Sequence, residues 1–299
     1  MTNFADRLAE AVRRKGNSLC VGIDPRWESL PKSIREQFGS ASIATIACAF
    51  EVFSLRVLDL VASLVPIVKP QSAFFELCGP PGMIALQSVV RRARELGLIV
   101  ILDSKRGDIA STAVAYADAA FGGLTVNGVH HTIWNADALT VNPYLGRDAV
   151  EPFIQSARLS GRGLFVLVRT SNPGSGLFQE LDCGGRKLYQ HVAQAVNEWN
   201  ESGFGSCGLG DVGAVVGATH PAELAELRQA MPNVWFLVPG YGAQGGSARD
   251  VAAAFRLDGL GAIVNSSRGI TFPFHPDEPN WEQAILDATE TAIGELRFL

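Results

Sequence analysis

The sequence predicts a single (β/α)8 TIM barrel of the α/β class, with parallel strands and an N-terminal helix, formed by residues 1–299. Three observations favour this fold. Short apolar runs alternate with helical periodicity along the whole chain, the runs are apolar enough for strands buried on both faces, and polar residues follow nearly every run. The length would also suit two ordinary domains, but the alternation shows no break.

The elements follow in chain order. Residues 1–16 form an amphipathic stretch that contains acids, so we expect a helix ending at Gly16 and not a signal peptide. The predicted strands are 18–24, 65–71, 98–105, 138–143, 163–170, 212–219, 234–240 and 261–267. Helical periodicity is clearest at 83–97, 187–203 and 221–231, where Pro221 suits a first helical turn.

The pattern leaves one competing fold and three long segments to consider. A doubly wound open sheet is the competing fold, but no glycine-rich fingerprint opens a helix after the first predicted strand. Three segments, 25–42, 144–163 and 172–187, are longer than a minimal barrel loop requires, and the sequence assigns them no role.

Composition excludes several classes of function. The net charge is −5 and basic clusters are absent, which disfavours binding to nucleic acid or to an anionic membrane. No apolar run approaches the roughly 18 residues that a membrane helix needs. Five scattered cysteines without a Cys-x-x-Cys pair indicate a reduced, cytoplasmic compartment; they are Cys20, Cys48, Cys78, Cys183 and Cys207.

Common catalytic motifs are also missing. The sequence has no G-x-S-x-G elbow of an α/β-hydrolase. The histidines show no zinc-ligand spacing, so we expect no metal; they are His130, His131, His191, His220 and His275. Adjacent His130 and His131 would point apart on a regular element, which favours a structural or rim position.

Polar residues gather where the predicted strands end. They are Asp24, Lys69, Asp103, Lys105, Asn142, Thr170, Ser171 and Arg268. A single polar strand end is normally a turn or a helix cap. In a barrel, however, all these ends lie on the one face that carries the active site.

The stretch VILDSKRGDIAST, residues 100–112, holds the densest charge. Asp103 and Lys105 leave the same face of a strand, and Asp108 follows the flexible Gly107. A purely structural interpretation makes Asp108 a helix cap and the other two an ion pair. The chemical interpretation favours a proton donor, because a lysine between carboxylates keeps its charge and cannot act as a Schiff-base nucleophile.

A second candidate site lies near the C-terminus. VPGYGAQGG, residues 238–246, and NSSRG, residues 265–269, follow the seventh and eighth predicted strands. Barrels often bind phosphate in these two loops, where glycine-rich backbone turns its N–H groups toward an anion. Arg268 would add a bidentate contact. The alternatives are a plain flexible turn and a surface arginine.

Several of these motifs together resemble one known family. LDSKRGDIAST is similar to the signature Asp-x-Lys-x-x-Asp-Ile-x-x-Thr of orotidine 5′-phosphate decarboxylases, and PGYGAQGG and NSSRG resemble their phosphate-binding loops. GIDPR, VKPQSAFFE and VNPYLGRD resemble the longer bacterial, or type 2, branch. The resemblance covers residues 4–290 and implies conversion of orotidine 5′-phosphate to uridine 5′-phosphate, the last step of de novo pyrimidine synthesis, without a metal or organic cofactor.

The resemblance also implies residue roles. Lys105 matches the proton donor, and Asp103 matches the residue beside the departing carboxylate. The residues that match substrate-binding positions are Asp24 and Lys69 at the ribose, Ser171 at the pyrimidine, and Gln244 and Arg268 at the phosphate. Asp108, Ile109 and Thr112 match residues that enter the neighbouring subunit's site, which implies a homodimer. Whether Thr170 or Ser171 faces the pyrimidine stays open.

Two other functions remain as alternatives. Related barrels with an Asp-x-Lys strand act on sugar phosphates with a metal ion, as decarboxylases or aldolases. They would be expected to carry a second acid at a neighbouring strand end, where this chain has Lys69. A barrel that only binds nucleotide, without turnover, is disfavoured by the intact set of Asp103, Lys105 and Asp108.

Overall fold

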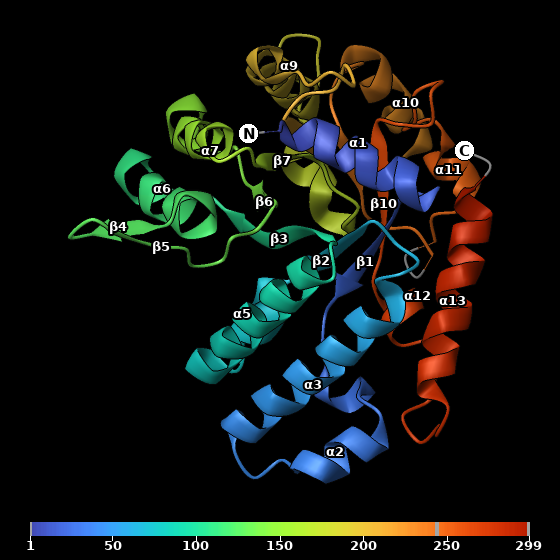
Figure 1. Ribbon diagram of the computed structural model, residues 1–299. Coiled ribbons are helices and arrows are strands. Elements are labelled where there is room, and N and C mark those ends of the chain that lie inside the picture. The colour runs from blue at the N-terminus through green and yellow to red at the C-terminus, as the bar shows by residue number, and fades with distance from the viewer. Residues whose placement is uncertain (1, 243–244, 298–299) are drawn as a thin grey trace.

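The fold is an eight-stranded parallel barrel, seen in a computed structural model that describes residues 2–242 and 245–297 (Figure 1). The strands close in the order β1-β10-β9-β8-β7-β6-β3-β2. They are β1 Leu19–Ile23, β2 Ile67–Pro70, β3 Ile99–Arg106, β6 Ala138–Val141, β7 Gly163–Arg169, β8 Val212–Val216, β9 Phe236–Val238 and β10 Ala262–Ser266. The predicted TIM barrel is confirmed, and each strand overlaps its predicted run.

Helices surround the barrel and also close one end of it. The longer outer helices are α2 Lys32–Phe38, α3 Ile43–Val61, α5 Gly79–Glu95, α6 Ala110–Ala117, α7 Arg147–Leu159, α9 Leu188–Asn200, α10 Pro221–Ala230 and α13 Trp281–Leu296. The short ones are α4 Ser72–Glu76, α8 Gly176–Gln179, α11 Ala248–Ala252 and α12 Arg268–Thr271. The predicted N-terminal helix is α1 Phe4–Lys15, which ends at Gly16 in the left-handed conformation, φ +66°.

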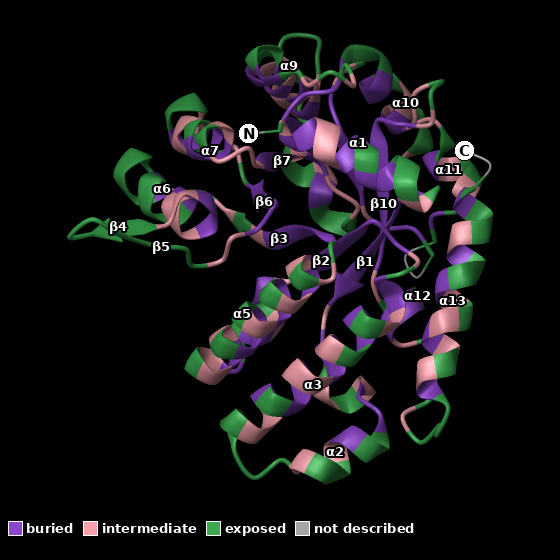
Figure 2. Ribbon diagram, viewed as in Figure 1, coloured by how far each residue is buried: buried purple, intermediate pink, exposed green. Residues whose placement is uncertain are grey.

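Side-chain alternation divides the core into two parts. Cys20, Ile67 and Ile101 point into the barrel and pack there against α1, whereas Val21, Val68 and Val100 point outward to the surrounding helices. Both faces of the strands are therefore buried, as Figure 2 shows in purple at the centre of the molecule. This explains why the strand runs are almost continuously apolar. The barrel interior is filled from the α1 end, which leaves the opposite end for polar residues.

The structure departs from the sequence analysis in two segments. Most of 144–163 is the barrel helix α7 and not an extended loop. Pro152 lies within this helix, and a proline in such a position normally argues against a helix. An antiparallel hairpin, β4 Leu124–Val126 and β5 Val129–His131, follows α6 and projects from the barrel (Figure 1). The sequence signal of this hairpin, which was not recognised above, is the pair Asn127-Gly128 between alternating apolar residues. Asn127 and Gly128 both have positive φ, as a tight hairpin turn requires.

The other long segments contain short helices. Residues 25–42 include a 3-10 turn, Trp27–Ser29, and α2, and residues 172–187 include a 3-10 turn, Pro173–Ser175, and α8. Within the described residues, no helix has both the length and the apolar character to cross a membrane. The expectation that the whole chain forms one domain stays a prediction.

Candidate active site

Strand alternation brings the predicted charged residues together at the end of the barrel opposite α1. Ile99 and Ile101 point into the barrel, so Asp103 continues the same inward row on β3. Lys69 continues the row of Ile67 on β2, and Asp24 follows Cys20 and Gly22 just past β1. These side chains therefore form a polar layer directly above the apolar filling of the barrel.

The centre of this layer is a lysine–aspartate–lysine array. Lys69 Nζ lies 2.7 Å from Asp103 Oδ2, and Lys105 Nζ lies 2.7 Å from Asp103 Oδ1. The side chains of Lys69 and Asp103 are 6% and 7% exposed, whereas that of Lys105 is 45% exposed. Lys105 is thus the most exposed member of the array.

Mutual attraction keeps the buried pair charged. Burial alone would raise the pKa of Asp103, but the ammonium groups of Lys69 and Lys105 hold that pKa well below its usual range. Burial alone would lower the pKa of Lys69, but Asp103, and next Asp24, raise it above its usual value. At neutral pH Asp103 is therefore a carboxylate and Lys69 an ammonium.

Among the buried polar atoms without a hydrogen-bond partner in the described residues, two belong to inward-facing residues at the barrel mouth. They are Oδ1 of Asp24 and Oδ1 of Asn265, the inward-facing residue near the end of β10. Buried polar atoms are normally satisfied, so unpartnered acceptors beside a charged array suit a ligand that carries donors, such as hydroxyl groups. Asp24 is among the site residues predicted from the sequence, whereas Asn265 is not.

The residues after β3 do not join the array of their own chain. Asp108 Oδ1 accepts a hydrogen bond of 2.8 Å from the N–H of Ile109, and Asp108 forms no ion pair with any described residue. Ile109 is the N-cap of α6 and is exposed, as is Thr112 on the first turn. Asp108 is therefore not the helix cap that the structural interpretation expected, and its carboxylate is available to another partner.

The end of β7 is organised by an arginine that the sequence analysis missed. Arg169 is fully buried and binds Glu223 and Glu180, each at 2.5 Å. The hydroxyl of the next residue, Thr170, bonds Asn172 Oδ1 at 2.7 Å and Gln179 Nε2 at 2.8 Å. With Thr170 held by its own loop, Ser171 stays the predicted contact to a pyrimidine.

The two predicted phosphate loops are neighbours, because β9 and β10 pair in the barrel. In the first, Gly240, Gly242 and Gly245 have positive φ, and a Cβ on Gly246 would lie 2.7 Å from the oxygen of Gly240. In the second, Arg268 is exposed, begins α12 and forms no ion pair with a described residue. Gln244 lies outside the described residues, so its place in the grip stays a prediction.

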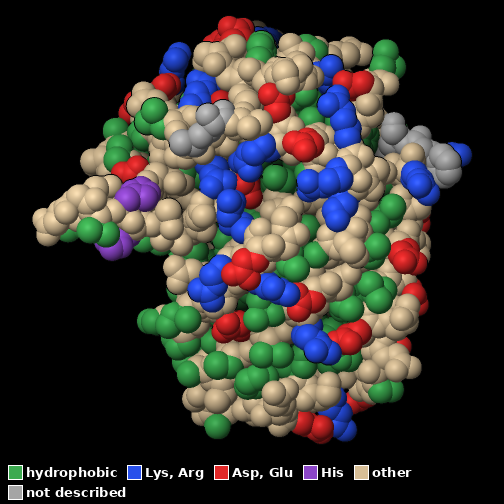
Figure 3. Space-filling model, in the orientation of Figure 1, with side chains coloured by type: hydrophobic (Ala, Val, Ile, Leu, Met, Phe, Trp, Pro, Cys, Tyr) green, Lys and Arg blue, Asp and Glu red, His purple; other side chains and the backbone are tan. Residues whose placement is uncertain are grey.

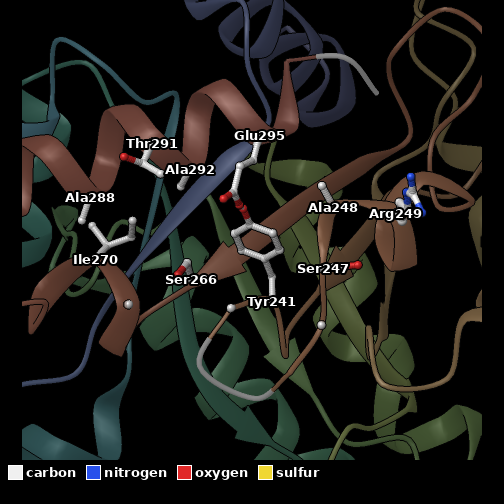
Figure 4. Close-up of a pocket in the computed structure, with 13 residues that line it drawn as sticks. Tyr241, Ser247, Ala248, Arg249, Ser266, Ile270, Ala288, Thr291, Ala292 and Glu295 are labelled. Carbon is white, nitrogen blue, oxygen red and sulfur yellow. The ribbon is translucent and has the colours of Figure 1, made fainter.

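A cavity of about 550 Å³ lies behind the first of these loops, against α12 and α13 (Figure 4). Tyr241 and Ser266 line it on the barrel side, and Ala288, Thr291 and Glu295 line it on α13. The hydroxyl of Tyr241 donates to Glu295 Oε2 across the cavity, which ties the start of the loop to the C-terminal helix. Burial, followed by Glu295, raises the pKa of Tyr241, so this hydroxyl keeps its proton.

Metal-ligating side chains do not cluster in the described part of the chain: no group of three or more His, Cys, Asp or Glu could hold an ion. His130 and His131 lie on the exposed hairpin, where His130 Nδ1 is 3.1 Å from Thr125 Oγ1. Both oxygens of Asp103 are bound by lysines, so a cation there would have to displace an ammonium group.

Comparison with known proteins agrees with this geometry. The model of the "Orotidine 5'-phosphate decarboxylase / HUMPS family" matches residues 17–278. The chain belongs to this family.

Relatives in the family match over almost their whole length. The chain is 50% identical to an orotidine 5′-phosphate decarboxylase of Rhodopirellula baltica, with 97% of each chain covered, and 41% identical to one of Deinococcus radiodurans, with 98% of each covered. Among solved structures, an OMP decarboxylase of Leishmania donovani is 34% identical, with a TM-score of 0.76 and complete coverage of both chains. A putative one from Toxoplasma gondii is 35% identical, with a TM-score of 0.80 and coverage of 99% and 98%.

Proposed function

We propose that this chain decarboxylates orotidine 5′-phosphate to uridine 5′-phosphate and CO2, the last step of de novo pyrimidine nucleotide synthesis, with Lys105 as the proton donor. The observation that carries the proposal is the array Lys69–Asp103–Lys105 at the barrel mouth. The chain belongs to a family whose similar members are named orotidine 5′-phosphate decarboxylases. The array offers one accessible ammonium group above a buried, fixed carboxylate.

The chemistry follows from these charges. When the bond between ring carbon C6 and the carboxylate breaks, its electron pair stays on C6 and CO2 leaves. The ammonium group of Lys105 stabilises the negative charge that develops there and then delivers its proton to C6. Lys105 is left neutral and regains a proton from solvent. Asp103 lies beside the position of the substrate carboxylate, so repulsion between the two carboxylates is relieved as CO2 departs.

Substrate binding uses residues farther from the ring. Asp24 and Lys69 hold the ribose hydroxyls, which fits the unpartnered Asp24 Oδ1, and Ser171 contacts the pyrimidine edge. Arg268 and Gln244 hold the phosphate. Binding energy from this remote group can pay for closing the glycine-rich loop over the site.

The active unit of the proposal is a homodimer with shared sites. Residues 119–136 carry no charged side chain, and the hairpin that they contain exposes Leu124, Val126 and Val129. Figure 3 shows hydrophobic and histidine side chains on this projecting part of the surface. Ile109 and Val114 extend the apolar surface along α6, beside Asp108. Exposed apolar side chains on α6 and on the hairpin that follows it suit a second copy of the chain, whose site would receive Asp108, Ile109 and Thr112.

The proposal calls for no cofactor, and it places the enzyme in the cytoplasm, in keeping with five free cysteines. The metal-dependent alternative on sugar phosphates has no observation in its favour, because both oxygens of Asp103 are already bound by ammonium groups.

The test is a spectrophotometric assay of the purified protein with orotidine 5′-phosphate, with and without EDTA. We expect the substrate absorbance to fall, uridine 5′-phosphate and CO2 to form in equal amounts, and EDTA to change nothing. Binding without turnover would leave a nucleotide-binding barrel. Turnover that EDTA abolishes would favour metal chemistry.

A further inference from the structure

Thr140 on β6 is a buried polar residue inside the barrel wall, only 1% exposed, that the sequence analysis did not single out. It lies in the same inward row as Ala138 and faces β3. A hydroxyl buried at this depth needs partners, and those it has all belong to the segment that carries the proposed chemistry.

The β3–β6 ladder is interrupted opposite Thr140. Leu102 pairs with Leu139 and Arg106 pairs with Val141, so three residues of β3, 103–105, face the single residue Thr140. Such a bulge removes ladder hydrogen bonds and changes the direction of side chains, and bulges are common next to active sites. Here the bulge falls on the segment that carries Asp103 and Lys105.

The hydroxyl of Thr140 replaces the lost ladder bonds. Its Oγ1 accepts hydrogen bonds from the N–H groups of Ser104 and Lys105, at 3.0 and 2.9 Å. A hydroxyl has two acceptor sites and one donor, so both acceptor sites are filled. The remaining proton is directed to Asp103 Oδ1, 2.8 Å away. The orientation of this hydroxyl is therefore fixed, and the two amides polarise it to donate more strongly to the carboxylate.

The backbone that Thr140 holds is strained. Lys105 has a φ of +47°, in the left-handed region that non-glycine side chains rarely adopt. Strain of this kind persists only where the surroundings enforce it, and it concentrates at functional sites. The amide of Lys105 is held by Thr140, and its side chain is held by Asp103, which Thr140 also binds.

We propose that Thr140 is a positioning residue, which holds the strained bulge 103–105 and the Asp103 carboxylate so that Lys105 Nζ points at the reacting carbon. This inference rests on the proposed role of Lys105. It assigns Thr140 no contact with the substrate. Its effect should therefore appear in kcat, which depends on proton delivery, and hardly in KM, which depends on the ribose and phosphate contacts.

The test compares three substitutions of Thr140 with a matched control. Thr140→Val keeps the shape and removes the hydroxyl, and we expect kcat to fall about 10²-fold, as displacement of a reacting group by about 1 Å can cause, with KM within about threefold. Thr140→Ser restores the hydroxyl and should stay within about fivefold of wild type. Thr140→Cys, with its weak thiol donor, should lie between the two and gives a readout if the valine variant does not fold.

The control is Thr289→Val on α13. Thr289 is also fully buried, but its hydroxyl only bonds the Ile285 carbonyl of its own helix, at 2.7 Å. The same loss of a buried hydroxyl there should leave kcat near wild type. Wild-type kcat in folded Thr140→Val or Thr140→Cys would overturn the inference, as would an equal loss in Thr140→Ser. If Lys105→Ala also retained activity, the proposed function of Lys105 would fail instead.

Discussion

Lys105 and Lys69 contact the same carboxylate, yet they differ in exposure and therefore in what they can do. Lys69 is almost completely enclosed, and its ammonium group helps to keep Asp103 ionised. Lys105 reaches the same aspartate from the open side of the barrel. In the proposed mechanism Lys69 holds the Asp103 carboxylate in place, and the more exposed Lys105 is the proton donor.

Lys105→Ala is expected to lower kcat by at least about 10³-fold, because it removes both the proton donor and the cation that faces the developing negative charge. Stability should change little, since Asp103 keeps Lys69 and Thr140 as partners. The measurement is kcat for orotidine 5′-phosphate together with urea unfolding. Lys32→Ala, which removes an exposed ammonium group 3.9 Å from Glu36, is the control and should be fully active. More than a tenth of wild-type activity in Lys105→Ala would eliminate this residue as the donor.

Arg268→Ala is expected to lower kcat/KM for orotidine 5′-phosphate by about 10²- to 10³-fold, because a charge-assisted bidentate contact to phosphate is lost. Orotidine has no phosphate, so its already low kcat/KM should change less than about threefold. The measurement is kcat/KM for both substrates in wild type, Arg268→Ala and the control Arg256→Ala, whose guanidinium group pairs with Asp258 at 3.2 Å. Equal losses for the two substrates would place Arg268 away from the phosphate.

The elements of the barrel were readable from the sequence because burial on both faces leaves long apolar runs. The site was readable where polar residues continue an inward row, as at Lys69 and Asp103. Thr140 was missed because a lone threonine inside an apolar strand resembles an ordinary β-branched core residue. Its importance depends on a bulge in the neighbouring strand, and no local pattern in either strand shows that pairing.

The conformation of the segment 172–187 could not be predicted from the sequence, because ion pairs between residues distant in the chain hold it. Arg169 and Glu180 are 11 positions apart, and Glu223, the other partner of Arg169, is on α10. Spacing in the sequence could not reveal these contacts. They fasten the segment beside Thr170 and Ser171 while leaving Leu177 and Phe178 exposed.

Glu180→Ala is expected to loosen this segment without unfolding the barrel, because Arg169 keeps its contact with Glu223. The free energy of local opening should decrease, so trypsin should cleave after Arg186 and Lys187 several-fold faster. The KM for orotidine 5′-phosphate should also rise. Glu180→Gln, which keeps a hydrogen-bond acceptor, should be affected less. Unchanged cleavage and KM in Glu180→Ala would show that the segment is held by other contacts.

At the scale of the whole molecule, the barrel supplies Lys69, Asp103 and Lys105 from adjacent strands, but Asp108 forms no ion pair with these lysines. The glycine turn at Gly107 makes this possible, since a Cβ there would lie 3.0 Å from the carbonyl of Asn142. Asp108 precedes α6, and the hairpin follows the other end of that helix; in the proposed dimer a second chain docks on these elements. Division of labour between chains would explain why Asp108 stays outside the ion pairs that Asp103 and Lys105 form in the same short stretch.

Complementation between two inactive variants tests this division. Lys105→Ala and Asp108→Ala should each be nearly inactive, but co-refolding equal amounts should restore activity to about a quarter of that of wild type treated identically. Random pairing makes about half of the dimers mixed, and each mixed dimer has one site with both lesions and one with neither. Differential tags on the two variants verify that mixed dimers form, and each variant refolded alone is the control. If tagged mixed dimers form but remain inactive, Asp108 acts in the site of its own chain, and Lys105 and Asp108 must then meet through a movement of the 106–109 turn within one barrel.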